Sequence, residues 1–383
     1  MIQLAHKRDC CGCHACVQVC PKGCITMKED NEGFLYPAVD VESCVDCALC
    51  ETVCPIINQG EKLEPLAVYA AKNPDDEVRM KSSSGGVFTM LAERTIDEGG
   101  VVFGARFSEG FDAVLHCAAE DIEGVATFRG SKYVQSKVGN TYKEAETFLK
   151  QDRKVLFSGT PCQIAGLKRY LRREYDNLLT VDVVCHGVPS PLVWREYLKW
   201  VVPQGEGVQY VNMRDKRNGW SSYCVDIRTE RGSICVPASK NLYIEGFLRD
   251  LYLRPSCYAC PAKAGRSGSD ITLGDFWGVA QSHPQFTDDK GVGLLLVGSK
   301  KGADALKEIG ANMEMSTYSS AIGYNPCIER SASEPPQRDI FWDTFAQDGV
   351  VAIEKVCRRM RPSLISRCVL KMKMAIWHII HRG

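Results

Sequence analysis

Apolar and polar positions follow one pattern in the first part of the chain and another in the rest. Up to about residue 62, short apolar stretches alternate with cysteine-rich loops, and residues 25–27 and 34–36 flank the polar segment 29–33. Two strand-like stretches joined in this way predict a short β-hairpin. After Pro65, strand-like and helix-like stretches alternate, which favours an α/β layered core.

The second pattern predicts individual elements. Strands are expected at residues 67–70, 100–104, 155–157, 179–184, 270–273 and 294–297. Helices are expected at residues 86–95, 140–151, 162–174 and 303–309. Shorter alternating runs between residues 209 and 237, which include Gly219 and Gly232, predict an antiparallel insertion in this layered domain.

Charge and composition narrow the possible classes. The 383-residue chain has 47 Lys and Arg and 47 Asp and Glu residues, so its net charge gives no reason to expect a nucleic-acid partner. Residues 1–8 contain no apolar core of signal-peptide length, and no window offers about 18 uninterrupted apolar residues. We therefore expect a cytoplasmic protein. Thiols stay reduced there, so 20 cysteines indicate metal or redox chemistry rather than disulfides.

Eight cysteines form two copies of one spacing, offset by 34 residues: Cys10, Cys13, Cys16 and Cys20 before Pro21, and Cys44, Cys47, Cys50 and Cys54 before Pro55. Thiolates at this spacing reach three corners of a cubane iron–sulfur cluster, and in bacterial-type ferredoxins the fourth cysteine serves the other cluster. We therefore predict two 4Fe-4S clusters, one held by Cys10, Cys13, Cys16 and Cys54, the other by Cys20, Cys44, Cys47 and Cys50. The alternative is a zinc ribbon, which uses paired Cys-x2-Cys units and fits the third cysteine of each copy poorly.

Two polar loops in the second part are candidate binding segments. Residues 82–86, Ser-Ser-Ser-Gly-Gly, open an expected helix whose first N–H groups are suited to a phosphate. They are equally typical of a serine N-cap with glycines that allow close packing. Residues 130–136 place a cation, a phenol and hydroxyls in one segment, as either a ligand contact or a solvated loop.

Four further cysteines form a second constellation. Cys162 and Cys185 each follow an expected core strand, and Cys257 and Cys260 form a Cys-x2-Cys pair in a proline-flanked loop. Together they are able to supply four thiolates to a third cluster; the alternative is two inert buried cysteines and a separate zinc or redox pair. Six others are interpreted as small buried hydrophobic residues: Cys11, Cys24, Cys117, Cys224, Cys235 and Cys327.

Six segments, in this order, resemble the family of the beta subunit of coenzyme F420 hydrogenase and dehydrogenase: residues 84–86, 130–133, 159–163, 185–187, 257–260 and 269–278. The resemblance runs from about residue 66 to about residue 310 and is specific to the family, not to a substrate. It implies noncovalently bound FAD and a third 4Fe-4S cluster held by Cys162, Cys185, Cys257 and Cys260. The FAD contacts that it implies are Ser82, Ser84, Gly85, Gly86, Ser131, Lys132, Tyr133 and Thr160.

The expected activity is that of an iron–sulfur flavoprotein oxidoreductase. In the family the flavin exchanges hydride with an organic substrate, while clusters carry single electrons to or from a ferredoxin or another redox protein. The candidate proton donors are His186, Lys132 and Asp275, and the alternative for each is a structural hydrogen-bonding group. Coenzyme F420, a chlorophyll derivative and a sugar-linked compound of cell-surface polysaccharide synthesis all remain possible substrates. Other functions are an electron relay without its own substrate and a zinc-binding interaction module.

The expected fold class is an α+β ferredoxin-like di-cluster module followed by an α/β domain with an antiparallel insertion. The module is expected at residues 1–62, the two parts of the domain that resembles the beta subunit at 63–150 and 151–330, and a basic tail at 331–383. No acidic residue follows Glu354, and the amphipathic basic segment after it predicts either peripheral contact with anionic lipid or a docked C-terminal helix.

Overall fold

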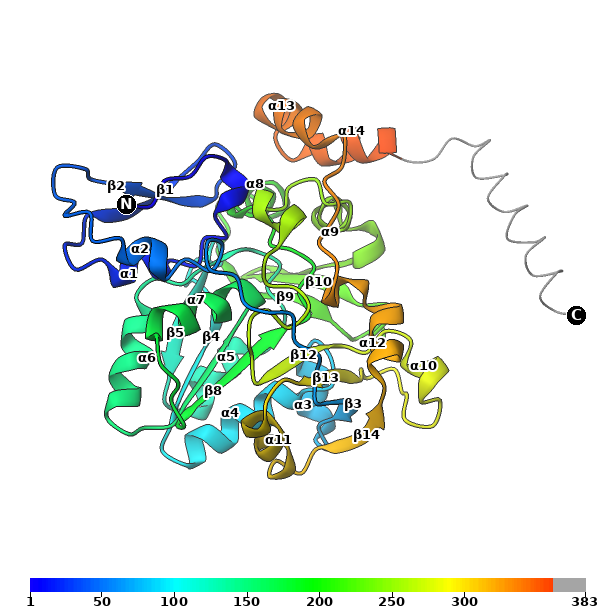
Figure 1. Ribbon diagram of the computed structural model, residues 1–383. Coiled ribbons are helices and arrows are strands. Elements are labelled where there is room, and N and C mark those ends of the chain that lie inside the picture. The colour runs from blue at the N-terminus through cyan, green and yellow to red at the C-terminus, as the bar shows by residue number, and fades with distance from the viewer. Residues whose placement is uncertain (361–383) are drawn as a thin grey trace, which may run out of the picture.

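The N-terminal module consists of a hairpin and two short helices, and it is the blue part at the upper left of Figure 1. The computed structural model describes residues 1–360. The elements of the module are η1 (Lys7–Asp9), α1 (Ala15–Val19), β1 (Ile25–Glu29), β2 (Leu35–Val39) and α2 (Leu49–Thr52). β1 and β2 pair antiparallel, with Ile25 opposite Val39, so the predicted hairpin is confirmed.

A nine-stranded sheet forms the centre of the large domain, in the order β14-β3-β13-β12-β8-β7-β4-β5-β6. Its strands are β3 (Ala67–Lys72), β4 (Val101–Phe107), β5 (Val114–Ala119), β6 (Ser136–Lys137), β7 (Val155–Gly159), β8 (Leu178–Val183), β12 (Ile271–Asp275), β13 (Gly293–Val297) and β14 (Asn312–Ser316). The neighbours β12, β8, β7 and β4 run parallel. Their carboxyl ends therefore meet at one edge, which is where open α/β sheets bind ligands.

Helices cover both faces of this sheet because its side chains alternate in direction. Phe103 and Phe157 pack with α6 and α7 on one face, whereas Val102 and Leu156 pack with α4, α5 and α11 on the other. The helices of this part are α3 (Asp76–Lys81), α4 (Val87–Asp97), α5 (Ile122–Phe128), α6 (Thr141–Lys150), α7 (Pro161–Leu171), α8 (Pro191–Val201), α10 (Val279–Ser282), α11 (Lys300–Lys307) and α12 (Tyr318–Tyr324). The helix expected to reach residue 174 ends at Leu171, because Arg172 adopts a left-handed conformation.

A second, three-stranded antiparallel sheet has the order β11-β10-β9. Its strands are β9 (Val208–Asp215), β10 (Cys224–Thr229) and β11 (Gly232–Pro237). It shares a hydrophobic core with α8 and with the C-terminal helices at the top of Figure 1. The remaining elements are η2 (Ala238–Lys240), α9 (Leu242–Leu248), η3 (Pro255–Ala259), η4 (Pro326–Ile328), α13 (Arg338–Asp348) and α14 (Val351–Met360).

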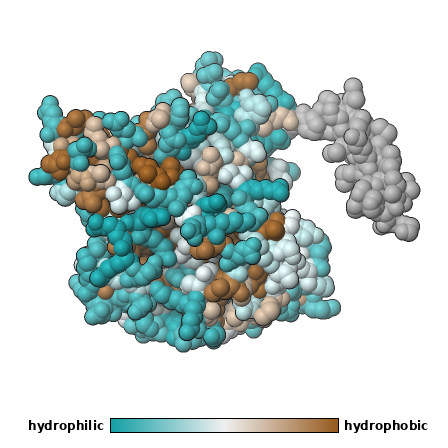
Figure 2. All heavy atoms as spheres, viewed as in Figure 1, coloured by the Kyte–Doolittle hydropathy of each residue, from teal (hydrophilic) through white to brown (hydrophobic). Residues whose placement is uncertain are grey.

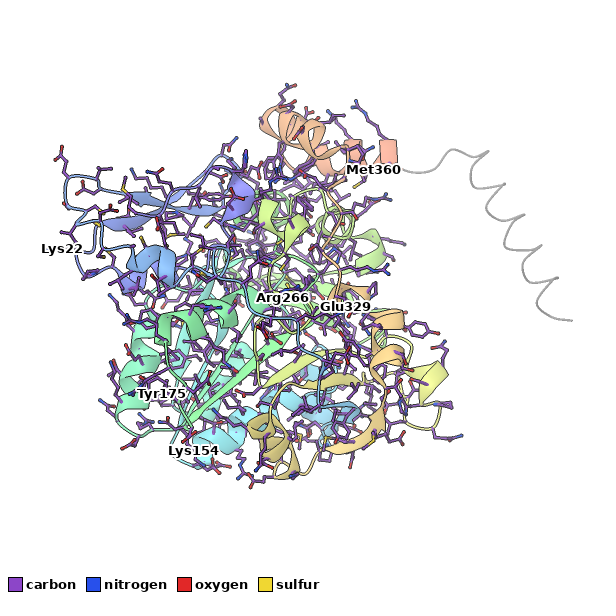
Figure 3. The ribbon with its side chains drawn as sticks, viewed as in Figure 1. Lys22, Lys154, Tyr175, Arg266, Glu329 and Met360 are labelled. Atoms are coloured by element: carbon purple, nitrogen blue, oxygen red, sulfur yellow. The ribbon has the colours of Figure 1, made fainter. Side chains whose placement is uncertain are left out.

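The structure bears on the membrane expectation only up to Met360, which is labelled in Figure 3. Across residues 1–360, no helix combines the length and the apolar character that crossing a membrane requires. Most of the basic segment for which a lipid contact is expected, residues 361–383, lies outside the described residues.

The module is joined to the large domain by direct packing and by a buried ion pair. Gly166 of α7 faces the first cysteine loop so closely that a Cβ atom there would lie 2.9 Å from the Cβ of Cys13. Arg338 of α13 donates to both carboxylate oxygens of Glu32 in the hairpin, at 3.0 and 2.5 Å. Both side chains are almost fully buried, at 7% and 10% exposure. The cysteine loops are therefore fixed against the sheet domain.

Candidate functional site

The two cysteine loops of the module have the same unusual backbone shape. Gly12 and His14 have positive φ angles in the first loop, and so do the matching residues Asp46 and Ala48 in the second. Positive φ is uncommon in residues other than glycine. Its recurrence at both positions, 34 residues apart, shows that the repeated spacing builds one loop geometry twice.

The first set of thiols is defined as Cys10, Cys13, Cys16 and Cys54. Cys10 is half-buried and the other three are buried. Burial raises the pKa of the Cys16 thiol to about 12, and nearby Cys10 and Cys54 raise it further. The backbone N–H of Gly12 donates to Cys10 Sγ at 3.4 Å, an arrangement that favours a thiolate. Cys54 thus lies beside cysteines of the other loop, as an interleaved arrangement requires.

The second set is defined as Cys20, Cys44, Cys47 and Cys50, and it lines one small cavity. Cys50 Sγ accepts a hydrogen bond from the Ile2 N–H at 3.3 Å, and Cys47 is exposed. Lys22, which lines the same cavity, lies at the outer end of the module in Figure 3. Val45, beside this set, is 56% exposed, and Figure 2 shows hydrophobic surface on the module. The second set therefore faces away from the large domain.

The third set is defined as Cys162, Cys185, Cys257 and Cys260. Cys162 lies in the first turn of α7, directly after β7, and Cys185 follows the neighbouring parallel strand β8. Cys257 Sγ accepts a hydrogen bond from the Val188 N–H at 3.4 Å. Burial raises the pKa of the Cys185 thiol well above its usual value, and the other three thiols raise it further. All four therefore lie close enough to influence one another.

The spacing of these thiols bears on the kind of metal centre. Among the residues that the structure describes, no three Cys, His, Asp or Glu side chains converge on a point where a single metal ion would sit. The thiolates of one zinc ion lie about 2.3 Å from it, whereas the thiolates of a cubane bind separate iron corners. The second set, whose four cysteines line a cavity, fits the larger group.

Some cysteines that were interpreted as inert have thiol partners. Cys11 hydrogen-bonds the thiols of both Cys13 and Cys162; the contact with Cys13 contributes most to raising its pKa. Cys24 Sγ lies 3.4 Å from Cys20 Sγ. Cys224 and Cys235, on β10 and β11, have sulfur atoms 2.8 Å apart. The correction matters most for Cys11, because it connects the first set to the third.

The two loops expected to contact FAD lie together. Ser131 donates its N–H to Ser83 Oγ at 2.6 Å, and the two hydroxyls are 2.9 Å apart. The Ser82 hydroxyl donates to Val78 O, and the Ser84 hydroxyl donates to Val292 O. These hydroxyls are therefore already engaged within the protein.

The glycines of the same loop have different structural roles. At Gly85, a Cβ atom would lie 2.2 Å from Ala71 O, so this residue allows the loop to pack on the sheet. Gly86 is the left-handed N-cap of α4. Thr160 caps α7 through Gln163 and also contacts Cys162 Sγ at 3.3 Å. The first turns of α4 and α7 leave backbone N–H groups without helical partners.

The three titratable candidates occupy separate environments. Lys132 donates to the carbonyls of Thr127 and Arg129, both at 3.0 Å, and burial lowers its pKa to about 7 although its side chain is partly exposed. His186 Nε2 lies 2.6 Å from Asp250 Oδ1. Within residues 1–360, no hydrogen bond or ion pair joins Lys132, His186 and Asp275 to one another.

Asp275, at the end of β12, belongs to a cluster that sequence patterns did not indicate. Arg214 of β9, which is 4% exposed, pairs with Asp275 at 3.1 Å and donates to the Tyr133 hydroxyl at 3.4 Å. Trp220 Nε1 donates to Asp275 at 3.0 Å and its ring stacks on Trp277. Because these residues come from distant segments, no local spacing could have revealed the cluster.

A cavity beside Cys185 contains a buried carboxyl group. Asp182, Lys263, Ser267 and Thr272 are among its lining residues. The Asp182 carboxylate accepts hydrogen bonds from Ser267 Oγ at 2.6 Å and from Thr272 Oγ1 at 2.5 Å. Burial nevertheless raises the pKa of Asp182 from 3.8 to about 6.

This raised pKa predicts a pH effect on stability. The native carboxyl group binds its proton more tightly than the unfolded one, so its stabilising contribution is complete below the unfolded pKa of 3.8 and is lost as the pH rises through about 6. The Asp182→Asn variant lacks this loss. The free energy of unfolding of the variant should therefore increase relative to wild type across that window in urea titrations. A difference that does not change with pH would contradict the prediction.

Comparison with known proteins agrees with this arrangement. Residues 9–56 match the 4Fe-4S dicluster domain, and residues 152–320 match the C terminus of the coenzyme F420 hydrogenase/dehydrogenase beta subunit. The F subunit of the F420H2 dehydrogenase of Methanosarcina mazei is 29% identical over 46% of this chain and 53% of its own length. The coenzyme F420-dependent sulfite reductase of Methanocaldococcus jannaschii is 26% identical over 54% of this chain and 32% of its own length.

The chain thus spans about half and about a third of the lengths of these two relatives. A chain of the F420-reducing [NiFe] hydrogenase complex from Methanosarcina barkeri superposes with a TM-score of 0.48 and 17% identity, over 77% of this chain and 91% of its own. From the two matched segments and the thiol sets within them, the chain belongs to the family of the coenzyme F420 hydrogenase/dehydrogenase beta subunit and carries an N-terminal 4Fe-4S dicluster domain.

Proposed function

We propose that the protein is an iron–sulfur flavoprotein oxidoreductase, acting on coenzyme F420 or another organic substrate. The observation that carries this proposal is the row of thiols from the module surface into the sheet domain. The second set faces solvent, the first set is buried against α7, and Cys11 hydrogen-bonds both Cys13 of the first set and Cys162 of the third. When bound, 4Fe-4S clusters supply one-electron transfer and a flavin supplies the conversion to two-electron chemistry.

The residues of each set would hold one cluster. Backbone N–H groups that donate to Cys10, Cys50 and Cys257 favour the thiolate form in each of the three sets. Residues 1–62 form the electron-transfer module in this scheme. Residues 63–330 form the sheet domain, with the third set in its second part, 151–330.

The proposed flavin site lies where the two predicted loops meet. Ser83 and Ser131 hold the loops together, and the helices α4 and α7 begin nearby in sequence. Because the hydroxyls of Ser82 and Ser84 are engaged, backbone N–H groups in the first turn of α4 are better placed to bind a phosphate. Lys132, whose pKa of about 7 suits proton release near neutral pH, is the favoured proton donor in this loop.

Anaerobic purification with iron, acid-labile sulfide and flavin analysis tests the proposal. Three clusters and one FAD per chain are expected, and reduced coenzyme F420 or reduced ferredoxin should bleach the flavin absorption. A protein that contains iron and sulfide but no flavin would instead support a relay without its own substrate. A colourless protein without acid-labile sulfide would overturn both.

The relay function is favoured by one comparison. The relative from Methanosarcina mazei is described as a subunit of F420H2 dehydrogenase, and this chain spans about half of it. A redox protein that docks on the module near Val45 and Cys47 is therefore the proposed partner. The flavin content and the substrate-dependent bleaching distinguish the two functions.

A further inference from the structure

Arg254 is a buried cation at the contact between the module and the large domain. It is 1% exposed, and it immediately precedes η3, the short helix that contains Cys257. Its side chain reaches across to the first cysteine loop. Arg254 therefore connects the backbone segment of the third set to the ligand loop of the first.

The guanidinium group is held by four hydrogen bonds. Nε donates to Cys10 O at 2.7 Å, and Nη2 donates to Cys10 Sγ at 3.5 Å and to Leu35 O at 2.8 Å. Nη1 donates to Gln135 Oε1 at 2.9 Å. The Tyr36 ring lies 4.3 Å away, in cation–π contact. Among the described residues, Arg254 has no carboxylate partner within ion-pair distance.

The neighbouring loop accommodates this approach through a glycine. A Cβ atom at Gly12 would lie 2.9 Å from Arg254 Nη1 and 2.9 Å from Gln135 Nε2, and Gly12 also has a φ angle of +70°. Any other residue would push the guanidinium away from the loop. The sequence Cys10-Cys11-Gly12-Cys13 thus fits both the thiol set and the arginine.

A buried charge without a counterion is expensive, at several kcal/mol, and a cation–π contact offsets only about 0.5–2 kcal/mol. The missing counter-charge lies in the thiol sets. Burial by itself lowers the pKa of Arg254, but Cys10, Cys11 and Cys257 help to hold it above the usual value. A cubane held by four thiolates is anionic and becomes more so on reduction, which makes it a suitable counterion.

We infer that Arg254 is a positioning residue that raises the reduction potential of the cluster proposed at the first set, through its positive charge and its hydrogen bond to Cys10 Sγ. The inference rests on the ligand assignment in the proposed function. A fixed cation and a hydrogen bond to a ligand sulfur both stabilise the reduced state, and both are known determinants of cluster potential. The effect would be selective, because the second set lies at the far end of the module.

The test is a potentiometric titration followed by EPR on the anaerobic full-length protein. In Arg254→Met, one N-terminal signal should be at least about tenfold harder to reduce, which corresponds to about 59 mV for a one-electron couple. The other N-terminal signal should not move. Arg254→Lys, which keeps the charge but loses the planar fork, should give an intermediate value.

The matched control is Arg195→Met. Arg195 pairs with Glu29 of the hairpin, so this variant removes one cation from the same domain interface, away from the thiols. It should leave both potentials unchanged. Equal shifts in Arg195→Met and Arg254→Met, or shifts of both N-terminal signals in Arg254→Met, would overturn the inference.

A wild-type measurement covers the case in which Arg254→Met does not fold. Protein labelled with ¹⁵N only in arginine guanidinium groups should show a weak ¹⁵N coupling to one reduced N-terminal cluster in pulsed EPR, and Arg254→Lys should lack it. No coupling in a protein that contains the clusters would refute the inference and leave the proposed function standing. A wild-type protein without iron and sulfide would refute the proposed function itself.

Discussion

Replacement of Cys185 by alanine should remove one cluster's iron and stop electron transfer between the module and the substrate. Cys185 belongs to the third set, at the carboxyl end of β8, and that set lies beyond Cys11 on the proposed route. A cubane that loses a ligand is no longer held at all four corners. The iron content should fall by about a third, and both N-terminal EPR signals should persist. Reduced ferredoxin should then reduce the module but not the flavin.

Cys327→Ala is the matched control for this variant. Cys327 lines the same cavity as Cys185, and Lys263 donates to the backbone carbonyls of both residues. It lies outside the third set, so its replacement should leave iron content and flavin reduction intact. If Cys327→Ala lost iron while Cys185→Ala kept it, the ligand assignment would be wrong.

Replacement of Arg338 by methionine should lower the free energy of unfolding by about 3–5 kcal/mol, the cost of breaking a buried ion pair. The variant leaves the Glu32 carboxylate buried, where only Arg338 now neutralises it. The hairpin that bears Glu32 would lose its anchor on α13 and the module would dock less firmly. Urea denaturation of the anaerobic protein measures the change.

Two further variants separate the charge effect from lost packing. Arg358→Met removes an exposed partner of Glu354, with 68% and 42% exposure, and should cost no more than about 1 kcal/mol. Combining Glu32→Leu with Arg338→Met removes both charges and should recover most of the lost stability, because no unpaired charge remains buried. A loss in the double variant as large as in Arg338→Met would show that packing, not charge, holds the interface.

Local patterns predicted much of the fold. The hairpin and strands such as β3, β7 and β13 were expected near their observed positions, because apolar runs bounded by turn residues are local signals. The helices α8, α13 and α14 were not identified. α8 begins at Ser190 and Pro191, a recognisable cap, but its apolar residues pack against a sheet and helices distant in sequence. The order of the nine strands also depends on long-range pairing.

The candidate site was predictable to a different degree in each part. Cysteine spacing indicated the thiol groups, since metal ligands at fixed intervals leave a signature in sequence. Arg254, Arg214 and Cys11 carried no such signature. Arg254 reaches Cys10, which is 244 residues earlier, and only the folded chain makes that contact. Charges that tune a site come from wherever the fold brings them, so sequence patterns do not reveal them.

The equal loop geometry of the module has a consequence for the direction of electron flow. Two loops with left-handed residues at matching positions offer their metal centres almost interchangeable cradles. Any energetic gradient between the centres must then originate outside the loops, in water on one side and in the sheet domain on the other. By docking a pseudo-symmetric unit on an asymmetric surface, the protein gives identical halves unequal tasks: one collects charge and the other delivers it inward.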